Sequence, residues 1–313
     1  MSRPSIPAKV SPSKKAHTLT IRCGFELVYE ASHEVPALLF LRPRSDSSHP
    51  ILEECSSVRA GQGGEDVVDV HGNRGLRVVF SPGENVLRHD LLAAVPSTPE
   101  RTGLQEKPVP VSELPAEVLR YILPSRYCDS DRLMDFAFKH FGETIHGLPR
   151  VLSICDWVHR HITYRWGAGS QLISASEAIE QGFGVCRDFA HVAIALCRCF
   201  NLPARYLTAY LPDIAFQDPG TPMDFHASFQ VYLGHRWIDF DARFNVQRIG
   251  RLPIAVGLDA VDAAFSTVFG AAELKRFDVW AYQIDPSRVR LGDPVDLNER
   301  LDGTLRLRIP GVS

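Results

Sequence analysis

Residues 182–200 are GFGVCRDFAHVAIALCRCF, and this stretch decides how the rest of the chain is interpreted. A Gly-x-Gly turn leads into an almost wholly apolar run, which predicts a buried helix from about Cys186 to Phe200. Cys186 would lie in the first turn, where backbone N–H groups are unpaired and the helix dipole is positive. This setting lowers a thiol pKa and makes Cys186 a candidate nucleophile. The alternative is a structural cysteine in a core helix, since most cysteines are simply buried.

A hairpin is predicted further along the chain. Two β-like runs, Phe225 to Leu233 and Arg236 to Ala242, flank the dipeptide Gly234-His235. A two-residue loop with a leading glycine favours a type II′ turn. The loop length also fixes the register, because Leu233 must then pair with Arg236.

This register makes His226 and Asp241 diagonal neighbours on one face of the hairpin. Such neighbours lie about 7–8 Å apart, within reach of an imidazole and a carboxylate. The opposite face is apolar, so the polar face is left free to line a cleft. Asp239 shares that face but lies farther from His226, so Asp241 is the better orienting carboxylate. Most isolated His/Asp pairs belong to a solvated hairpin face, but the coincidence with Cys186 favours a Cys–His–Asp site.

The region before the Cys186 helix falls into two parts, one with strand-like and one with helix-like sequence patterns. Short β-like runs separated by turn clusters predict a small antiparallel β domain. Its expected strands are Leu19 to Tyr29, Ala37 to Leu41, Val67 to Val70, Leu76 to Phe80 and Val86 to Ala94. After Cys128 the apolar period becomes helical. The expected helices run from Asp129 or Ser130 to Phe141, from Pro149 to Ile162, and from a capping box at Ser174 and Glu177 to Gln181.

These patterns divide the chain into five segments. They are a disordered tail (1–17), an N-terminal β domain (18–95), a Pro-rich linker (96–127), a catalytic domain (128–285) and a C-terminal extension (286–313).

Composition limits the classes of function. The 313 residues carry a net charge of −3, which gives no basic surface for nucleic acid. No apolar run approaches the roughly 18–20 residues that span a bilayer, and residues 1–17 lack the apolar part of a signal peptide, so no membrane partner is expected. The seven cysteines are odd in number and widely spread, which argues for a reducing cytoplasm rather than a disulfide framework. One Cys and one His far apart do not supply the four ligands of a zinc site, and no metal or organic cofactor is implied.

Several motifs together resemble the bacterial transglutaminase-like cysteine peptidase family. They are Gly184-Val-Cys186-Arg-Asp-Phe-Ala-His191, Leu202-Pro-Ala-Arg205-Tyr206, His226-Ala-Ser-Phe229 and Trp237-x-x-x-Asp241, within about residues 128–285. The resemblance implies an α+β fold, in which an N-terminal antiparallel β domain precedes a papain-like core with a nucleophile helix packed on an antiparallel sheet. It also implies that Cys186, His226 and Asp241 form the family's triad.

Other motif positions carry weaker expectations. Ser228 stands where the family often has Trp, which would alter the wall of the cleft. Arg187, Asp188 and His191 match the family motif on the nucleophile helix, and we expect them to make structural hydrogen bonds.

The implied reaction is acyl transfer from a peptide or carboxamide through a Cys186 thioester. His226 would protonate the leaving amine, and water would complete a protease or amidase reaction. An oxyanion hole needs two donors: the Cys186 N–H is one, and the side chain of Tyr164 or Trp166 is a candidate for the other. The partner is a peptide or protein substrate. Two alternatives remain open, a protein-glutamine transamidase with the same triad and a non-catalytic peptide-binding module.

Overall fold

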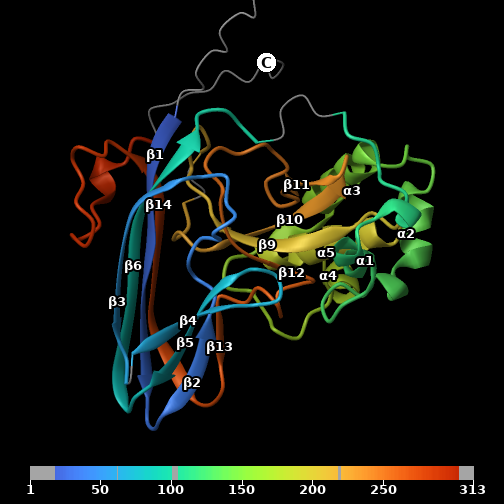
Figure 1. The fold of residues 1–313 in the computed structure, drawn as a ribbon. Helices are drawn as coiled ribbons and strands as arrows, with labels where there is room; N and C mark the ends of the chain where they lie inside the picture. Colours follow the sequence, from blue (N-terminus) through green and yellow to red (C-terminus); the bar gives the residue numbers. More distant parts are fainter. Residues whose placement is uncertain (1–17, 62, 101–104, 218–219, 303–313) are drawn as a thin grey trace, which may run out of the picture.

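The computed structural model describes residues 18–61, 63–100, 105–217 and 220–302 (Figure 1). This part of the chain contains three four-stranded antiparallel sheets and one short parallel strand pair. Two of the sheets form a β domain, and the third carries the helices of a second unit. The predicted α+β class is therefore confirmed. The tail expected at residues 1–17 lies outside the described residues.

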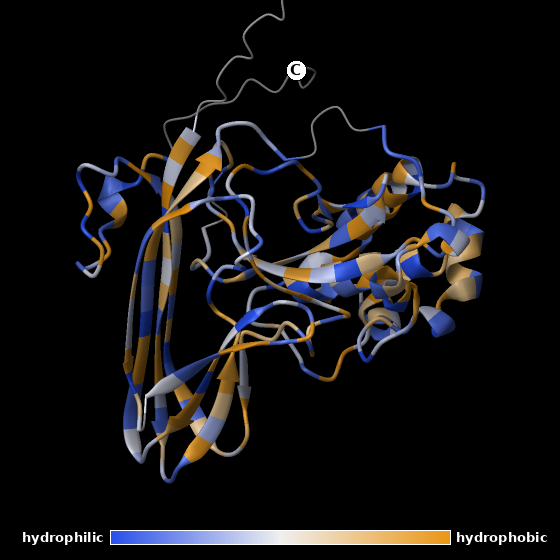
Figure 2. Cartoon of the chain, in the orientation of Figure 1, coloured by the Kyte–Doolittle hydropathy of each residue, from blue (hydrophilic) through white to orange (hydrophobic). Residues whose placement is uncertain are grey.

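The β domain is built from two sheets, with strand orders β14-β1-β6-β3 and β13-β2-β5-β4. Hydrophobic and hydrophilic residues alternate along its long strands (Figure 2), as expected when one face of each sheet is buried. Tyr29 stacks on Phe80 across the two sheets with ring centroids 4.7 Å apart. The strands are β1 Thr18–Ala31, β2 Val35–Leu39, β3 Ile51–Arg59, β4 Gly64–Val68, β5 Arg74–Phe80, β6 Gly83–Pro96, β13 Ser266–Val268 and β14 Ala272–Ile284.

Strand β3 was not predicted from the sequence. It pairs with β6 at the edge of its sheet, and Leu52 to Ser57 are all exposed. A strand without a buried face has no need for alternating apolar residues, so it leaves no periodic signal.

The chain returns to the β domain after it has formed the second unit. β14 pairs with β1 from Ile284 opposite Thr20 to Ala272 opposite Ala31, and β13 pairs with β2. The catalytic domain was expected to run from residue 128 to residue 285. Its last part, residues 266–284, instead contains β13 and β14, which pair with strands of the β domain. Pairing between such distant segments leaves no local mark in the sequence.

The second unit packs helices on the sheet β11-β10-β9-β12. Its central helix α5 is buried at every residue from Asp188 to Arg198, between β9 and β10 on one side and α3 and α4 on the other. The strands are β7 Thr163–Tyr164, β8 Phe183–Gly184, β9 Ala204–Tyr210, β10 His226–Leu233, β11 Arg236–Phe240 and β12 Leu252–Gly257. The helices are α1 Ala116–Leu119, α2 Met134–Phe141, α3 Leu148–His161, α4 Ala175–Gln181 and α5 Cys186–Arg198, with 3₁₀ turns η1 Val111–Glu113, η2 Arg120–Ile122, η3 Ser130–Arg132 and η4 Leu297–Glu299.

The β10–β11 hairpin has the predicted register, with Leu233 opposite Arg236. Its turn is type I′ rather than the expected type II′, because Gly234 and His235 both have positive φ, 56° and 62°. The predicted polar face is open only in part. Tyr232 on that face packs against Val109, Leu114 and Val118 of the Pro-rich segment. Gln230, Trp237 and Asp239 line a cavity of about 370 Å³, and the end of the hairpin at His226 reaches a smaller one.

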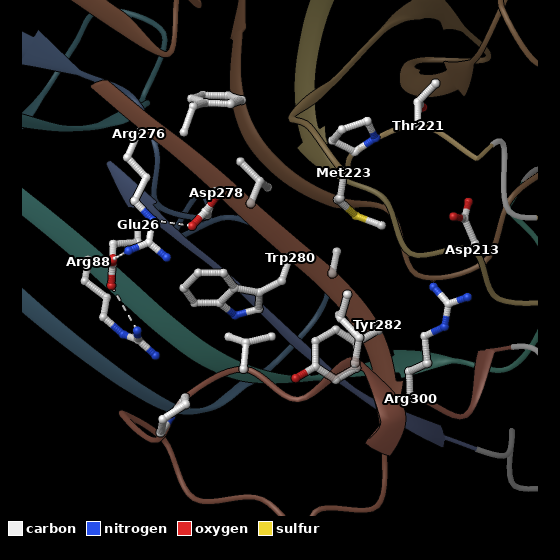
Figure 3. A pocket seen from close by; sticks show the side chains of 17 residues that line it. Glu26, Arg88, Asp213, Thr221, Met223, Arg276, Asp278, Trp280, Tyr282 and Arg300 are labelled. Carbon is white, nitrogen blue, oxygen red and sulfur yellow. Dashed lines mark hydrogen bonds and ion pairs between the residues drawn. The ribbon is translucent and has the colours of Figure 1, made fainter. Parts of the chain in front are cut away.

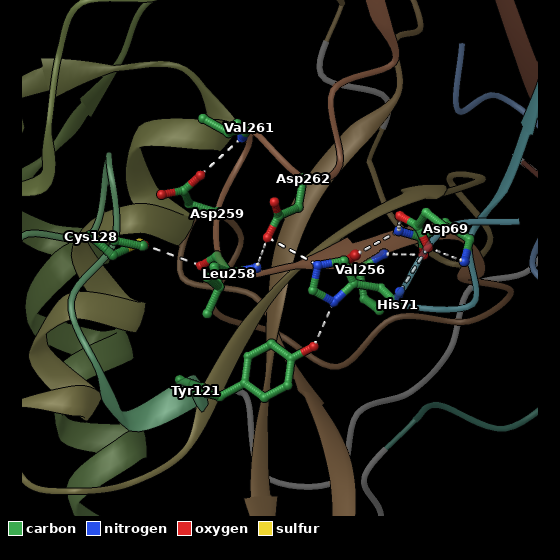
Figure 4. Close-up of polar contacts among 12 residues, drawn as sticks. Asp69, His71, Tyr121, Cys128, Val256, Leu258, Asp259, Val261 and Asp262 are labelled. Atoms are coloured by element: carbon green, nitrogen blue, oxygen red, sulfur yellow. Dashed lines mark hydrogen bonds and ion pairs between the residues drawn. The ribbon is translucent and has the colours of Figure 1, made fainter. Parts of the chain in front are cut away.

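A polar network joins the two units (Figure 4). In the turn between β4 and β5, His71 Nδ1 lies 2.9 Å from the Tyr121 hydroxyl, and its Nε2 lies 3.1 Å from Asp262. The fully buried Asn73 exchanges two 2.8 Å hydrogen bonds with the backbone of Val256 in β12. The β domain is thereby fixed to the edge strand of the other sheet. Within the described ranges, no helix is both long and apolar enough to cross a membrane.

Candidate active site

Cys186 is the first residue of α5, and contacts around the start of this helix fix its position. Asp188 accepts a 2.8 Å hydrogen bond from the N–H of Val185 and so caps the helix. A side chain at Gly184 would put a Cβ 2.6 Å from the Asp188 carboxylate, so the tight approach requires glycine here. Gly184 also pairs with Tyr164 through the β7–β8 ladder, which brings Tyr164 beside the start of α5.

His226 begins β10, and Asp241 follows the last residue of β11. His226 Nε2 lies 2.6 Å from Asp241 Oδ2, and both side chains are buried. The second oxygen of Asp241 accepts the backbone N–H groups of Arg243 and Phe244, each at 3.1 Å. With Nε2–H donating to the carboxylate, Nδ1 is the imidazole nitrogen left to accept a proton.

The thiol of Cys186 lies next to this pair. Cys186 and His226 line one small cavity of about 50 Å³, and the N–H of Ala227, the residue after His226, donates a hydrogen bond toward the Cys186 sulfur. The structure thus places the three predicted site residues together, one from a helix start and two from the end of a hairpin.

The resting thiol is neutral, contrary to the expectation from its helix position. Burial and the negative charge of Asp224 raise the pKa of Cys186 to about 11, against the opposing effects of Ala227 N–H and Arg243. The helix dipole, worth about 0.3–1 kcal/mol, does not outweigh them. Burial also lowers the pKa of His226, although Asp241 acts in the opposite direction. Thiol and imidazole are therefore both neutral near pH 7.

A buried arginine that sequence analysis missed supports Asp241. Arg251 lies 3.1 Å from Asp241 Oδ2, donates two hydrogen bonds of 2.9 and 3.0 Å to Glu100, and a third of 2.8 Å to the Ser228 hydroxyl. Burial opposes ionisation of Asp241, but His226 and Arg251 together hold its pKa well below the usual range. Arg251 and Glu100 belong to no recognisable motif, so only the folded structure reveals the ion pairs.

The other predicted positions divide into two groups. Tyr164 and Trp166 line the small cavity with Cys186, as expected of cleft residues. Ser228 does not fit its expected place in the cleft wall, because it is buried and its hydroxyl binds Arg251 beneath the site.

The polar residues of the α5 motif make structural contacts. Arg187 donates to the carbonyl of Ser170, and His191 accepts the backbone N–H of Ala260 at 3.2 Å. Asp188 caps the helix. In the part of the chain that the structure describes, no three His, Cys, Asp or Glu side chains are grouped to hold a metal ion.

Two larger cavities adjoin the small one. One of about 610 Å³ also reaches Cys186 and has an aromatic lining that includes Tyr29, Tyr206 and Phe265. The other, of about 550 Å³, lies against Trp280 and Tyr282 of the β domain (Figure 3). It shares four lining residues with the small cavity, namely Asp213, Thr221, Pro222 and Met223.

Comparison with known proteins shows which family has this arrangement. The family model of the transglutaminase-like superfamily matches residues 139–242, a range that contains Cys186, His226 and Asp241. A crystal structure from Cytophaga hutchinsonii, described as a "Putative Cysteine Protease", is 30% identical, covers 86% of this chain and 92% of its own, and superposes with a TM-score of 0.75. The chain belongs to the transglutaminase-like superfamily. The predicted family is thus confirmed, and these similarities support a cysteine-dependent enzyme.

The similarity to the Cytophaga structure extends beyond residues 139–242. The coverage of the Cytophaga structure is too large for residues 139–242 alone, so its match includes most of the β domain. An uncharacterized protein of Mycobacterium leprae is 25% identical over 144 residues, which are 45% of this chain. This chain spans about half, 51%, of that relative's length.

Proposed function

We propose that this protein is a cysteine-dependent acyl-transfer enzyme that cleaves peptide or carboxamide bonds, as a protease or amidase. The supporting observation is the 2.6 Å contact between His226 and Asp241, together with the small cavity that His226 and Cys186 both line. The description of the Cytophaga hutchinsonii relative as a cysteine protease agrees with this choice.

The resting protonation states suggest how the reaction begins. Because thiol and imidazole are neutral, the proton of Cys186 moves to Nδ1 of His226 as the sulfur attacks the carbonyl carbon. Asp241 stabilises the imidazolium that forms. The backbone N–H of Cys186 is one donor for the oxyanion, and Tyr164 or Trp166, which line the cavity, would supply the second.

The first half of the reaction ends when the imidazolium of His226 gives its proton to the leaving amine, and a thioester remains on Cys186. The second half releases the acyl group. Water then attacks the thioester in a hydrolase, with His226 as base. An amine in place of water would make the same site a transamidase.

Turnover of a peptide-amide library, with and without a primary amine, tests the proposal. We expect hydrolysis products from the wild type and none from Cys186→Ala, whose melting temperature should be unchanged because the loss of one sulfur leaves a small cavity. If turnover occurs only when the primary amine is added, and the product is its amide, the enzyme is a transamidase. Equal turnover by Cys186→Ala would overturn the proposal, and peptide binding without turnover would leave a binding module.

A further inference from the structure

Asp224 lies at the junction of the two cavities that meet at Cys186. It comes two residues before His226 and lines both the small cavity and the aromatic one. The residue as a whole is exposed, but the surrounding protein raises the pKa of its carboxyl to about 6, although the N–H of Phe225 donates to it, so the group is charged at pH 7. Among the described residues, no side chain forms a hydrogen bond or close ion pair with Asp224.

The cations around Asp224 are directed elsewhere. The Arg243 guanidinium lies over the ring of Tyr164, 3.5 Å from its centroid, and acts on Asp224 only at longer range. Arg187 donates to the carbonyl of Ser170 and contacts Asp188. The negative charge of Asp224 therefore remains largely uncompensated in the wall of the substrate site.

This charge works against the nucleophile in the empty site. A carboxylate beside a thiol disfavours the thiolate, and Asp224 is the largest electrostatic contribution that raises the pKa of Cys186. Apart from the Phe225 N–H, its carboxylate has no hydrogen-bond partner among the residues that the structure describes. A cation held by Asp224 would offset the charge and make the thiol easier to deprotonate.

We propose that Asp224 binds a cationic group of the substrate, the ammonium or guanidinium of a Lys or Arg residue next to the amide that Cys186 attacks. The inference rests on the proposed function, because it names the substrate class of that site. Asp224 lines both cavities that reach Cys186, so the cation can belong to either the acyl or the amine side of the amide. Substrate binding and thiol activation are then coupled through one carboxylate.

Matched peptide amides test the specificity. Each pair carries Lys or acetyl-lysine, on the acyl side in one pair and on the amine side in the other. In at least one pair, the wild type should favour Lys about fivefold in kcat/KM, the size expected for a solvent-accessible ion pair. Asp224→Asn should lose this preference but still cleave the acetyl-lysine peptide. The control Asp135→Asn, an exposed carboxylate on α2, should keep it. An Asp224→Asn enzyme that still favours Lys would overturn the inference.

A second test needs no turnover. Methanethiosulfonates that carry a quaternary ammonium or a sulfonate label thiols, and mass spectrometry of peptides gives the rate at Cys186 apart from the exposed Cys55. Wild type and Asp135→Asn should favour the cationic reagent, and Asp224→Asn should reduce the ratio about fivefold or more. An unchanged ratio in Asp224→Asn would refute the inference. If wild type cleaves no peptide but the ratio changes as expected, the proposed function fails and the cation site stands.

Discussion

The aspartates around the β10–β11 hairpin differ in what they contact, and so in their expected roles. Asp241 bonds to His226, whereas Asp239 accepts a 2.9 Å hydrogen bond from the side-chain amide of Gln230. Asp224 has no side-chain hydrogen bond or close ion pair within the described part of the chain, and it lines the cavities instead. The hairpin register identified Asp241 from sequence, because a two-residue loop fixes which residues are neighbours. Asp224 could not be identified, since its exposure beside Cys186 depends on α5 and β10 meeting in space.

Asp241→Asn should lower kcat/KM by about 10⁴-fold, because the amide favours the wrong imidazole tautomer. Asp239→Asn should cost less than about tenfold, since Asp239 does not contact His226. Steady-state kinetics on one peptide amide measures both. A larger loss in Asp239→Asn than in Asp241→Asn would show that the orienting carboxylate is misassigned.

The dependence of kcat/KM on pH should have an acid limb below the ordinary imidazole value of about 6.5. Burial lowers the pKa of His226, and only the neutral imidazole can accept the thiol proton. As the pH falls through that pKa, the imidazole becomes charged and activity is lost. In Asp241→Asn the limb should move to lower pH, because the carboxylate that favours imidazolium is gone. A wild-type limb above pH 7 would contradict the neutral-pair mechanism.

The secondary-structure elements that have strong local sequence patterns match their predictions. The helix predicted from Cys186 to about Phe200 is α5, and the residue pairing of the hairpin is as predicted. The polar face of β10 is covered at some positions, which was not predicted because the segments that cover them are remote in sequence. Arg251 donates a hydrogen bond to Ser228 on this face, and apolar side chains of the Pro-rich segment pack against Tyr232.

Arg251→Met should destabilise the protein by about 3–5 kcal/mol, because Glu100 and Asp241 would lose the buried cation they share. Urea unfolding measures the difference. The control Lys275→Met removes an exposed ion pair with Glu273 and should cost at most about 1 kcal/mol. Equal losses in the two variants would mean that the Arg251 network does not hold the hairpin to the rest of the unit.

At the scale of the whole molecule, the strands of the β domain come both before and after the other unit along the chain. Its first sheet pairs β1 with β14, the earliest and the last strand of the described chain. A boundary near residue 96 looks natural in the sequence, where β-like runs give way to prolines. The structure shows instead that the β domain combines the first and the last strands of the described chain, which a scan of local patterns cannot detect.

A fragment of residues 97–302 should therefore aggregate or unfold, because β14 would expose the edge that pairs with β1. A fragment of residues 105–265, which omits β13 and β14, should stay more soluble. Size-exclusion chromatography and thermal unfolding compare the two. Cooperative unfolding of the longer fragment as a stable monomer would show that the β domain is not one folding unit.

The central claim is that Cys186 carries the acyl group of the substrate. Rapid acid quench of the reaction with a peptide amide, followed by mass spectrometry of the intact protein and its peptides, measures this directly. We expect a transient mass increase equal to the acyl group, mapped to the peptide that contains Cys186 and absent from Cys186→Ala. Substrate cleavage with no such adduct, or an adduct on another cysteine, would contradict the claim.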